Sequence, residues 1–219
     1  MASTMNTSAA EQSREIDWYF DFISPFAYLQ HCRLTRDYPE IRINFYPVIF
    51  GALLQKYGHK GPAEIESKRL MTLRYCHWYA KKQGFDFRFP DTHPFRPVST
   101  LRLALAANCE PAAIRRIFEF IWVEGHDPSE ENNFTELAGQ LSIEDARAAT
   151  QHPDVKSRLM ENTRRAIDLG AFGVPTIVIG DKLFWGEDVT GIAMDFLDNP
   201  ALFDAREYQR LESIPNGLA

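Results

Sequence analysis

Apolar and polar residues alternate along residues 16–22, with the two-residue period of a β-strand. Ser24 and Pro25 follow, and a serine N-cap with a proline in the first turn predicts a helix that ends before Pro39. Alternation returns at residues 41–45 and indicates a second strand. This part of the chain therefore predicts a strand, a crossover helix and a parallel strand, the right-handed βαβ unit.

The middle of the chain has a helical period instead. Its clearest helix is predicted by apolar residues at i, i+3, i+4, i+7 and i+8, namely Ile114, Ile117, Phe118, Ile121 and Trp122. Ser142 and Asp145 resemble a capping box and predict the start of another helix. Residues 84–97 contain three prolines and four phenylalanines and predict an ordered loop. No convincing strand pattern occurs in this region, so we expect it to be all-helical.

The pattern changes again after a predicted helix at about 154–169, which stops at Gly170. Two short apolar runs, 176–179 and 183–185, are joined by a Gly-Asp pair and predict a β-hairpin, and a last helix is expected at about 188–198. The order βαβ, helical block, ββα is that of an α/β thioredoxin-like domain interrupted by an all-helical insertion. The predicted divisions are a disordered tail (1–15), the first part of the thioredoxin-like domain (16–50), the helical insertion (51–165) and the second part (166–219).

Composition narrows the class of protein. The 219 residues carry a net charge of −6, which disfavours non-specific binding to nucleic acid, and no apolar run is long enough for a membrane helix. The three cysteines show no CxxC spacing, which argues against a dithiol redox centre or a disulfide scaffold, and the histidines lack metal-ligand spacing. The polar first fifteen residues do not resemble a secretory signal. We therefore expect a cytoplasmic protein without a metal.

Ser24 is the first candidate for chemistry, because it stands at the junction of the first strand and the first helix. The N-terminus of a helix stabilises an anion, and a serine hydroxyl there can donate a hydrogen bond to a bound thiolate. The alternative is that Ser24 only caps the helix.

Val174-Pro175 and the segment Trp185–Asp188 are the second and third candidates. If the Val174-Pro175 bond is cis, the Val174 N–H and C=O are exposed at a strand end and can pair with a peptide-like ligand. The alternative is a proline that only starts a strand. Glu187 and Asp188 precede a helix, where they either cap it or hold the ammonium group of a ligand.

Three segments occur in a characteristic order: YFDFISPFAYL at 19–29, GAFGVPT at 170–176 and LFWGED at 183–188. Together they resemble the 2-hydroxychromene-2-carboxylate isomerases, relatives of the kappa-class glutathione transferases and of DsbA-like proteins. The resemblance implies glutathione as cofactor, with its sulfur at Ser24 and its cysteinyl backbone at Val174, beside Pro175. It further implies a homodimer and places the rest of the cofactor-binding site at Lys68, Trp185, Gly186, Glu187 and Asp188.

The resemblance also implies the activity, a glutathione-dependent isomerisation of a small aromatic carboxylate. The family's reaction converts 2-hydroxychromene-2-carboxylate to trans-o-hydroxybenzylidenepyruvate by reversible addition of the thiolate. This chain departs from the family at Glu187, where Asn or Ser is frequent, and at His59, where the family has Asn. Two further hypotheses stay open, a kappa-like glutathione transferase and a non-catalytic thioredoxin-like module that binds peptides.

Overall fold

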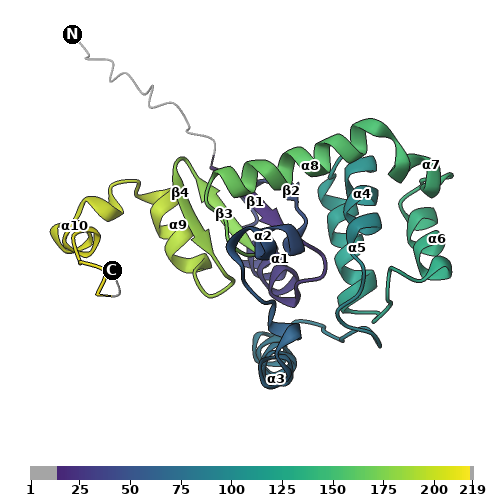
Figure 1. Cartoon of the computed structure of the whole chain (residues 1–219), viewed down its shortest axis with the longest axis horizontal. Coiled ribbons are helices and arrows are strands. Elements are labelled where there is room, and N and C mark those ends of the chain that lie inside the picture. Colours follow the sequence, from purple (N-terminus) through teal and green to yellow (C-terminus); the bar gives the residue numbers. More distant parts are fainter. Residues whose placement is uncertain (1–13, 218–219) are drawn as a thin grey trace, which may run out of the picture.

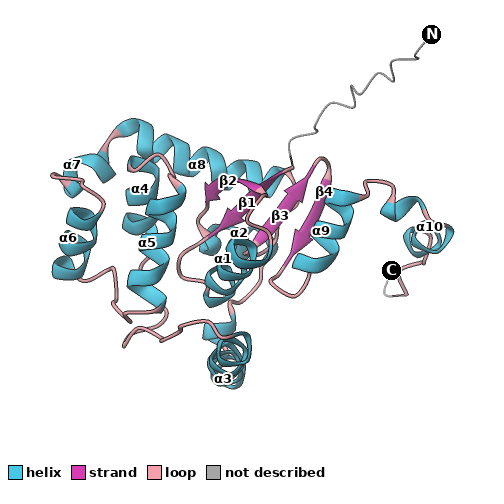
Figure 2. Cartoon of the chain, turned by 180° about the vertical axis from the view of Figure 1, so that it is seen from behind, coloured by secondary structure: helices cyan, strands magenta, loops and turns pink. Residues whose placement is uncertain are grey.

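A four-stranded mixed sheet forms the centre of the computed structural model, which describes residues 14–217. The strands lie in the order β2-β1-β3-β4 (Figures 1 and 2). β1 (Glu15–Phe20) pairs in parallel with β2 (Arg42–Pro47) and antiparallel with β3 (Thr176–Ile179), and β3 pairs antiparallel with β4 (Lys182–Trp185). The two ends of the chain thus build one sheet, as the alternating patterns predict.

Helices make up most of the remaining described chain. Short 3₁₀ helices occur at 62–64 and 202–204. The α-helices are α1 (Pro25–Asp37), α2 (Phe50–Tyr57), α3 (Glu66–Gln83), α4 (Val98–Ala106), α5 (Pro111–Trp122), α6 (Glu131–Gln140), α7 (Ala146–Gln151), α8 (Pro153–Asp168), α9 (Thr190–Asp198) and α10 (Arg206–Glu212). In Figure 1, α4 to α7 gather at one end of the molecule, and α8 runs from them back to the sheet.

The sheet buries both faces, as the alternation in β1 requires. Ile16, Trp18 and Phe20 point into the larger core, which also holds apolar residues of α1, α5 and α9. Tyr19 points the other way and packs in a smaller cluster with residues of α2 and α8, including Leu53 and Ala166. The molecule is therefore a sheet between two layers of helices, the thioredoxin-like α/β architecture that the sequence predicts.

Most predicted elements are present with small shifts at their ends, and one helix start was wrong. The chain turns at Ser142, whose φ is +58°, and α7 begins later, with Asp145 as its N-cap. The Asp145 carboxylate accepts a hydrogen bond from the Ala148 N–H at 2.8 Å. A side chain can cap a helix only from the residue whose backbone has the N-cap conformation. In this chain that residue is Asp145, three positions after Ser142.

The loop 84–97 is ordered, as expected, because its aromatic side chains fill space around the buried Trp122 of α5. Phe87 stacks on the Trp122 ring at 5.8 Å between centroids, and Phe89 meets it edge-on at 5.5 Å. Of the predicted tail, residues 1–13 lie outside the described part of the chain, and β1 begins at Glu15. No helix between residues 14 and 217 combines the length and the hydropathy needed to cross a membrane.

Candidate active site

A cavity of about 940 Å³ opens at the N-terminus of α1. Its walls come from the β1–α1 turn, α2, the chain from residue 58 into α3, the turn at 93–98, and residues 172–174 with Trp185. The surface is mainly apolar and includes Ile23, Phe26, Ile49, Phe50, Leu54, Leu73, Pro94 and Phe172. Segments next to strands from both ends of the chain, and helices that lie between them in the sequence, therefore meet at one cavity.

Ser24 lies in the wall of this cavity and also caps α1. Its Oγ accepts a hydrogen bond from the Ala27 N–H at 3.3 Å, and Pro25 fills the first helical position. The hydroxyl hydrogen of Ser24 takes part in no hydrogen bond among residues 14–217. Both predictions for Ser24 are compatible in this geometry, because a hydroxyl that accepts at the cap can still donate into the cavity.

The Val174-Pro175 peptide bond is cis, and Val174 lines the same cavity. Neither the N–H nor the C=O of Val174 is hydrogen-bonded within the described residues. The carbonyls on either side of Val174 are engaged: the Thr176 hydroxyl donates to the Gly173 carbonyl, and the Gly186 N–H donates to the Pro175 carbonyl, both at 2.9 Å. Two free backbone groups thus stand in a fixed position at the end of β3.

Trp185 reaches the cavity because Gly173 leaves room for it. A Cβ on Gly173 would lie 2.3 Å from Nε1 of the Trp185 indole. The indole also contacts the Phe172 ring, at 4.8 Å between centroids. Trp185 is half-exposed, so one side of the ring is available to a ligand that enters beside Val174.

Asp21 is a buried carboxyl in the turn before Ser24. Its two oxygens accept hydrogen bonds from the backbone N–H groups of Ile23 (3.1 Å) and Phe50 (3.0 Å). Burial raises the pKa of Asp21 to about 7, against the lowering effect of these two hydrogen bonds. The carboxyl therefore ties the Ser24 turn to the first residue of α2, two segments that form adjacent walls of the cavity.

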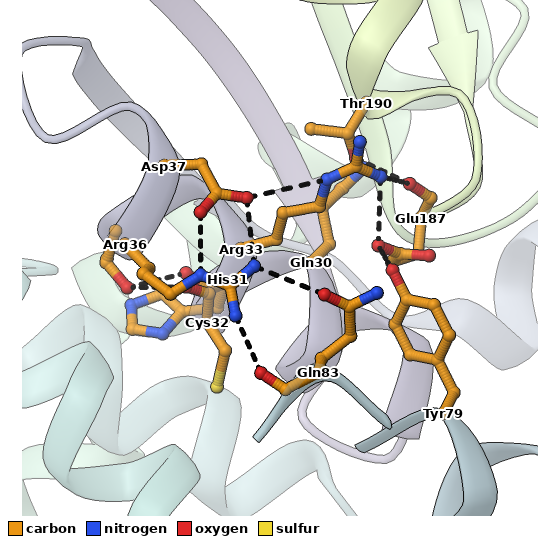
Figure 3. A network of polar contacts seen from close by, with 11 residues as sticks. Gln30, His31, Cys32, Arg33, Arg36, Asp37, Tyr79, Gln83, Glu187 and Thr190 are labelled. Carbon is orange, nitrogen blue, oxygen red and sulfur yellow. Dashed lines mark hydrogen bonds and ion pairs between the residues drawn. The ribbon is translucent and has the colours of Figure 1, made fainter. Parts of the chain in front are cut away.

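Glu187, two residues after Trp185, is not part of the cavity lining and contacts side chains of two helices (Figure 3). Its carboxylate pairs with Arg33 of α1 at 3.2 Å and accepts a hydrogen bond from the Tyr79 hydroxyl of α3 at 2.5 Å. Burial, together with the hydrogen bond to Glu187, raises the pKa of Tyr79. Glu187 is 4% exposed, so its charge is used to join the segment after β4 to two helices.

Gln30 of α1 anchors the same segment (Figure 3). Its Nε2 donates to the Gly186 carbonyl and to the Thr190 hydroxyl, both at 2.9 Å, while its Oε1 accepts from Trp18 at 2.7 Å. All the polar atoms of this buried amide are thus paired, which fixes the segment from Trp185 to Thr190 against α1.

The predicted site residues divide into two groups. Ser24, Lys68, Val174 and Trp185 line the cavity, and the structure brings them together. The other four, Pro175, Gly186, Glu187 and Asp188, lie outside its lining. The Gly186 N–H donates a hydrogen bond to the Pro175 carbonyl, Glu187 is buried, and Asp188 is exposed. The assignment of these residues to a cofactor stays a prediction.

Sequence reasoning missed four residues of the cavity wall: Asp21, Gly173, Arg69 and His93. The signal for Asp21 was its position, directly after the apolar end of β1 and before the predicted helix N-cap. The other three depend on contacts between distant segments, which no local pattern reports.

The cysteines do not supply a reactive thiolate to this cavity. Burial raises the pKa of Cys32 and of Cys109 to about 11 and that of Cys76 to about 12, and all three are free. Within residues 14–217 no three His, Cys, Asp or Glu side chains are grouped closely enough to hold a metal ion. A thiolate that reacts at Ser24 therefore has to arrive with a ligand.

Comparison with known proteins gives the family. Residues 15–198 match the family model of the DSBA-like thioredoxin domain. The 2-hydroxychromene-2-carboxylate isomerase of Pseudomonas putida is 30% identical over 183 residues, which cover 79% of this chain and 89% of that protein. The glutathione S-transferase kappa 1 of Caenorhabditis elegans is 22% identical over 210 residues, which cover 84% of this chain and 91% of that protein.

A solved structure of a 2-hydroxychromene-2-carboxylate isomerase has the same fold. It superposes with a TM-score of 0.72 at 23% identity, over 91% of this chain and 100% of that one. The chain therefore belongs to the family of DsbA-like thioredoxin domains, in the group that contains the 2-hydroxychromene-2-carboxylate isomerases.

Proposed function

We propose that this protein is a glutathione-dependent isomerase of a small aromatic carboxylate such as 2-hydroxychromene-2-carboxylate. The observation that carries the proposal is the position of the Ser24 hydroxyl, at a helix N-terminus and in the wall of an apolar cavity. The names of the relatives support both the isomerisation and the use of glutathione, since isomerases and a glutathione transferase of the kappa class are among them.

The residues of the cavity fit glutathione. A peptide-like cofactor needs backbone partners, and the unpaired N–H and C=O of Val174 offer one donor and one acceptor in the antiparallel manner of strand addition. Lys68, which lines the cavity from α3, offers a cation to a glutathione carboxylate. Trp185, Gly186 and Asp188 would form the end of the site that receives the γ-glutamyl group.

Ser24 would hold the cofactor's sulfur as a thiolate. Its hydroxyl donates a hydrogen bond to the charged sulfur, and the free N–H groups at the start of α1 add the positive end of the helix dipole. Both interactions favour the anion and lower the pKa of the thiol. The bound thiolate would supply reversible addition to a conjugated carbon of the substrate, which allows rotation about the former double bond before the same thiolate is expelled.

The remaining network positions these groups. Glu187, through Arg33 and Tyr79, would keep the segment after β4 at a fixed distance from α1, and Asp21 would keep the Ser24 turn against α2. The apolar walls would take the aromatic body of the substrate and keep water from the reacting carbon. No net oxidation or reduction occurs, which suits a site without cysteines.

Calorimetry with glutathione tests the proposal first, followed by turnover of 2-hydroxychromene-2-carboxylate. Saturable binding and glutathione-dependent isomerisation support it. Absence of binding at millimolar glutathione contradicts it and favours the module that binds peptides at Val174.

A kappa-like transferase is the second candidate, and a transferase among the relatives favours it. In that reaction the thiolate adds to an electrophile and stays bound to it. Incubation with glutathione and 1-chloro-2,4-dinitrobenzene separates the two, because a stable conjugate points to transfer rather than isomerisation.

We also propose a homodimer in the cytoplasm. Leu70, Met71 and Trp78 of α3 are 46%, 61% and 53% exposed, an apolar surface that a second copy can cover. The three unpaired cysteines agree with a reducing compartment. Sedimentation of the wild type and of Trp78→Glu tests the dimer, which the charge should weaken.

A further inference from the structure

The walls of the cavity carry more positive than negative groups. Two carboxyl groups line it: Asp21 is buried and accepts two backbone hydrogen bonds, and Glu64 is exposed and accepts one from the Gly61 N–H at 2.6 Å. Lys60, Lys68 and Arg69 also line it, and none of them has an ion pair within residues 14–217. An apolar cavity with such a rim favours a ligand with an apolar body and an anionic group.

Arg69 differs from the two lysines because it is fixed beside the Ser24 turn. Its guanidinium donates to the backbone carbonyl of His93 at 3.3 Å, and the His93 ring contacts the carbonyl of Ile23 at 2.9 Å. Because a carbonyl only accepts, Nε2 of His93 carries the hydrogen of that bond. One residue, His93, therefore connects Arg69 to the residue that precedes Ser24.

Lys68 and Arg69 are neighbours in sequence but project differently from α3. Consecutive helical residues point about 100° apart, so the two cations serve different parts of the cavity. Arg69 uses one of its five N–H groups on His93, and the others stay available in a planar fork that matches a carboxylate.

We propose that Arg69 determines specificity by binding the anionic group of the substrate, an aromatic carboxylate whose reactive carbon faces Ser24. This inference rests on the proposed function for the reaction itself, but the binding step is independent of glutathione. Lys68 then remains for the cofactor, and Arg69 selects charged over neutral aromatic compounds.

Binding of 2-naphthoate and of its neutral amide, 2-naphthamide, tests this role by calorimetry, with and without saturating glutathione. The wild type should prefer the carboxylate. A charge-assisted hydrogen bond from an exposed guanidinium corresponds to about a tenfold change in affinity, so Arg69→Gln should reduce that preference about tenfold. Arg69→Lys keeps the charge without the fork and should lose part of the preference.

Arg74→Gln is the matched control, since Arg74 lies on the same helix, exposed and outside the cavity lining. It should leave the preference unchanged. Equal preference in the wild type and Arg69→Gln overturns the inference, and so does an equal loss of affinity for the acid and the amide, which indicates a structural role. Failure of glutathione to bind while the preference follows Arg69 overturns the proposed isomerase alone.

Discussion

Asp21→Asn should change how the stability of the protein depends on pH. Burial raises the pKa of Asp21 from 3.8 to about 7, so between these values the folded protein keeps a proton that the unfolded chain has released. This group therefore stabilises the fold below pH 4, and its contribution is lost as the pH rises toward 7. A shift of about three units at about 1.4 kcal/mol per unit corresponds to a loss on the order of 4 kcal/mol over this range.

Urea unfolding, followed by circular dichroism at several pH values from 4 to 8, measures the effect. The asparagine variant cannot ionise at this position, so the free energy of unfolding of the wild type minus that of the variant should fall as the pH rises. Asp204→Asn removes a carboxylate from an exposed position and controls for the change in net charge. Parallel curves for the wild type and Asp21→Asn would refute the reasoning, because they require Asp21 to be ionised throughout.

Two further substitutions test how Trp185 and the segment after it are held beside the cavity. Gly173→Ala places a methyl group 2.3 Å from the Trp185 indole, so the ring must move. Loss of the contact between this ring and Phe172 should cost about 0.5–1.5 kcal/mol of stability, and calorimetry should show that glutathione binds about tenfold more weakly. Gly139→Ala, at a helical site with no neighbour within 4 Å, should instead stabilise the protein slightly, and equal results for both would contradict the steric argument. Glu187→Gln removes the closer of the two ionic partners of Arg33 and leaves only Asp37, at 3.9 Å; it should lower stability by about 1–3 kcal/mol in urea unfolding and weaken glutathione binding. Unchanged stability and binding would mean that the segment after β4 needs no such anchor.

The elements of the fold could be predicted because their signals are local. The alternation in β1 places Trp18 and Tyr19 on opposite faces, and both faces are buried. Ser24 and Pro25 set the start of α1 whatever surrounds them. The turn at Gly180, with φ of +61°, joins β3 and β4 where the sequence places it. Periodicity and turn chemistry suffice for such features.

The electrostatics of the site could not be predicted in the same way. Glu187 and Arg33 are 154 positions apart, and only the folded chain brings them together. From the sequence, a second carboxylate next to Asp188 suggested a cap or a ligand for an ammonium group. In the structure its carboxylate contacts Arg33 and Tyr79. The role of a charged side chain depends on its partners, and tertiary packing determines which partners it has.

The pKa of the thiol of bound glutathione, in the wild type and in Ser24→Ala, tests the central claim most directly. A hydrogen bond to a charged acceptor contributes roughly 1.5–3 kcal/mol, so removal of the hydroxyl should raise this pKa by about one to two units. Thiolate absorbance followed against pH gives the value, and Ser24→Thr, which keeps a hydroxyl, should stay close to the wild type. Turnover at neutral pH should fall about ten- to a hundredfold in Ser24→Ala. Equal pKa values and equal rates would mean that Ser24 is only the cap of α1.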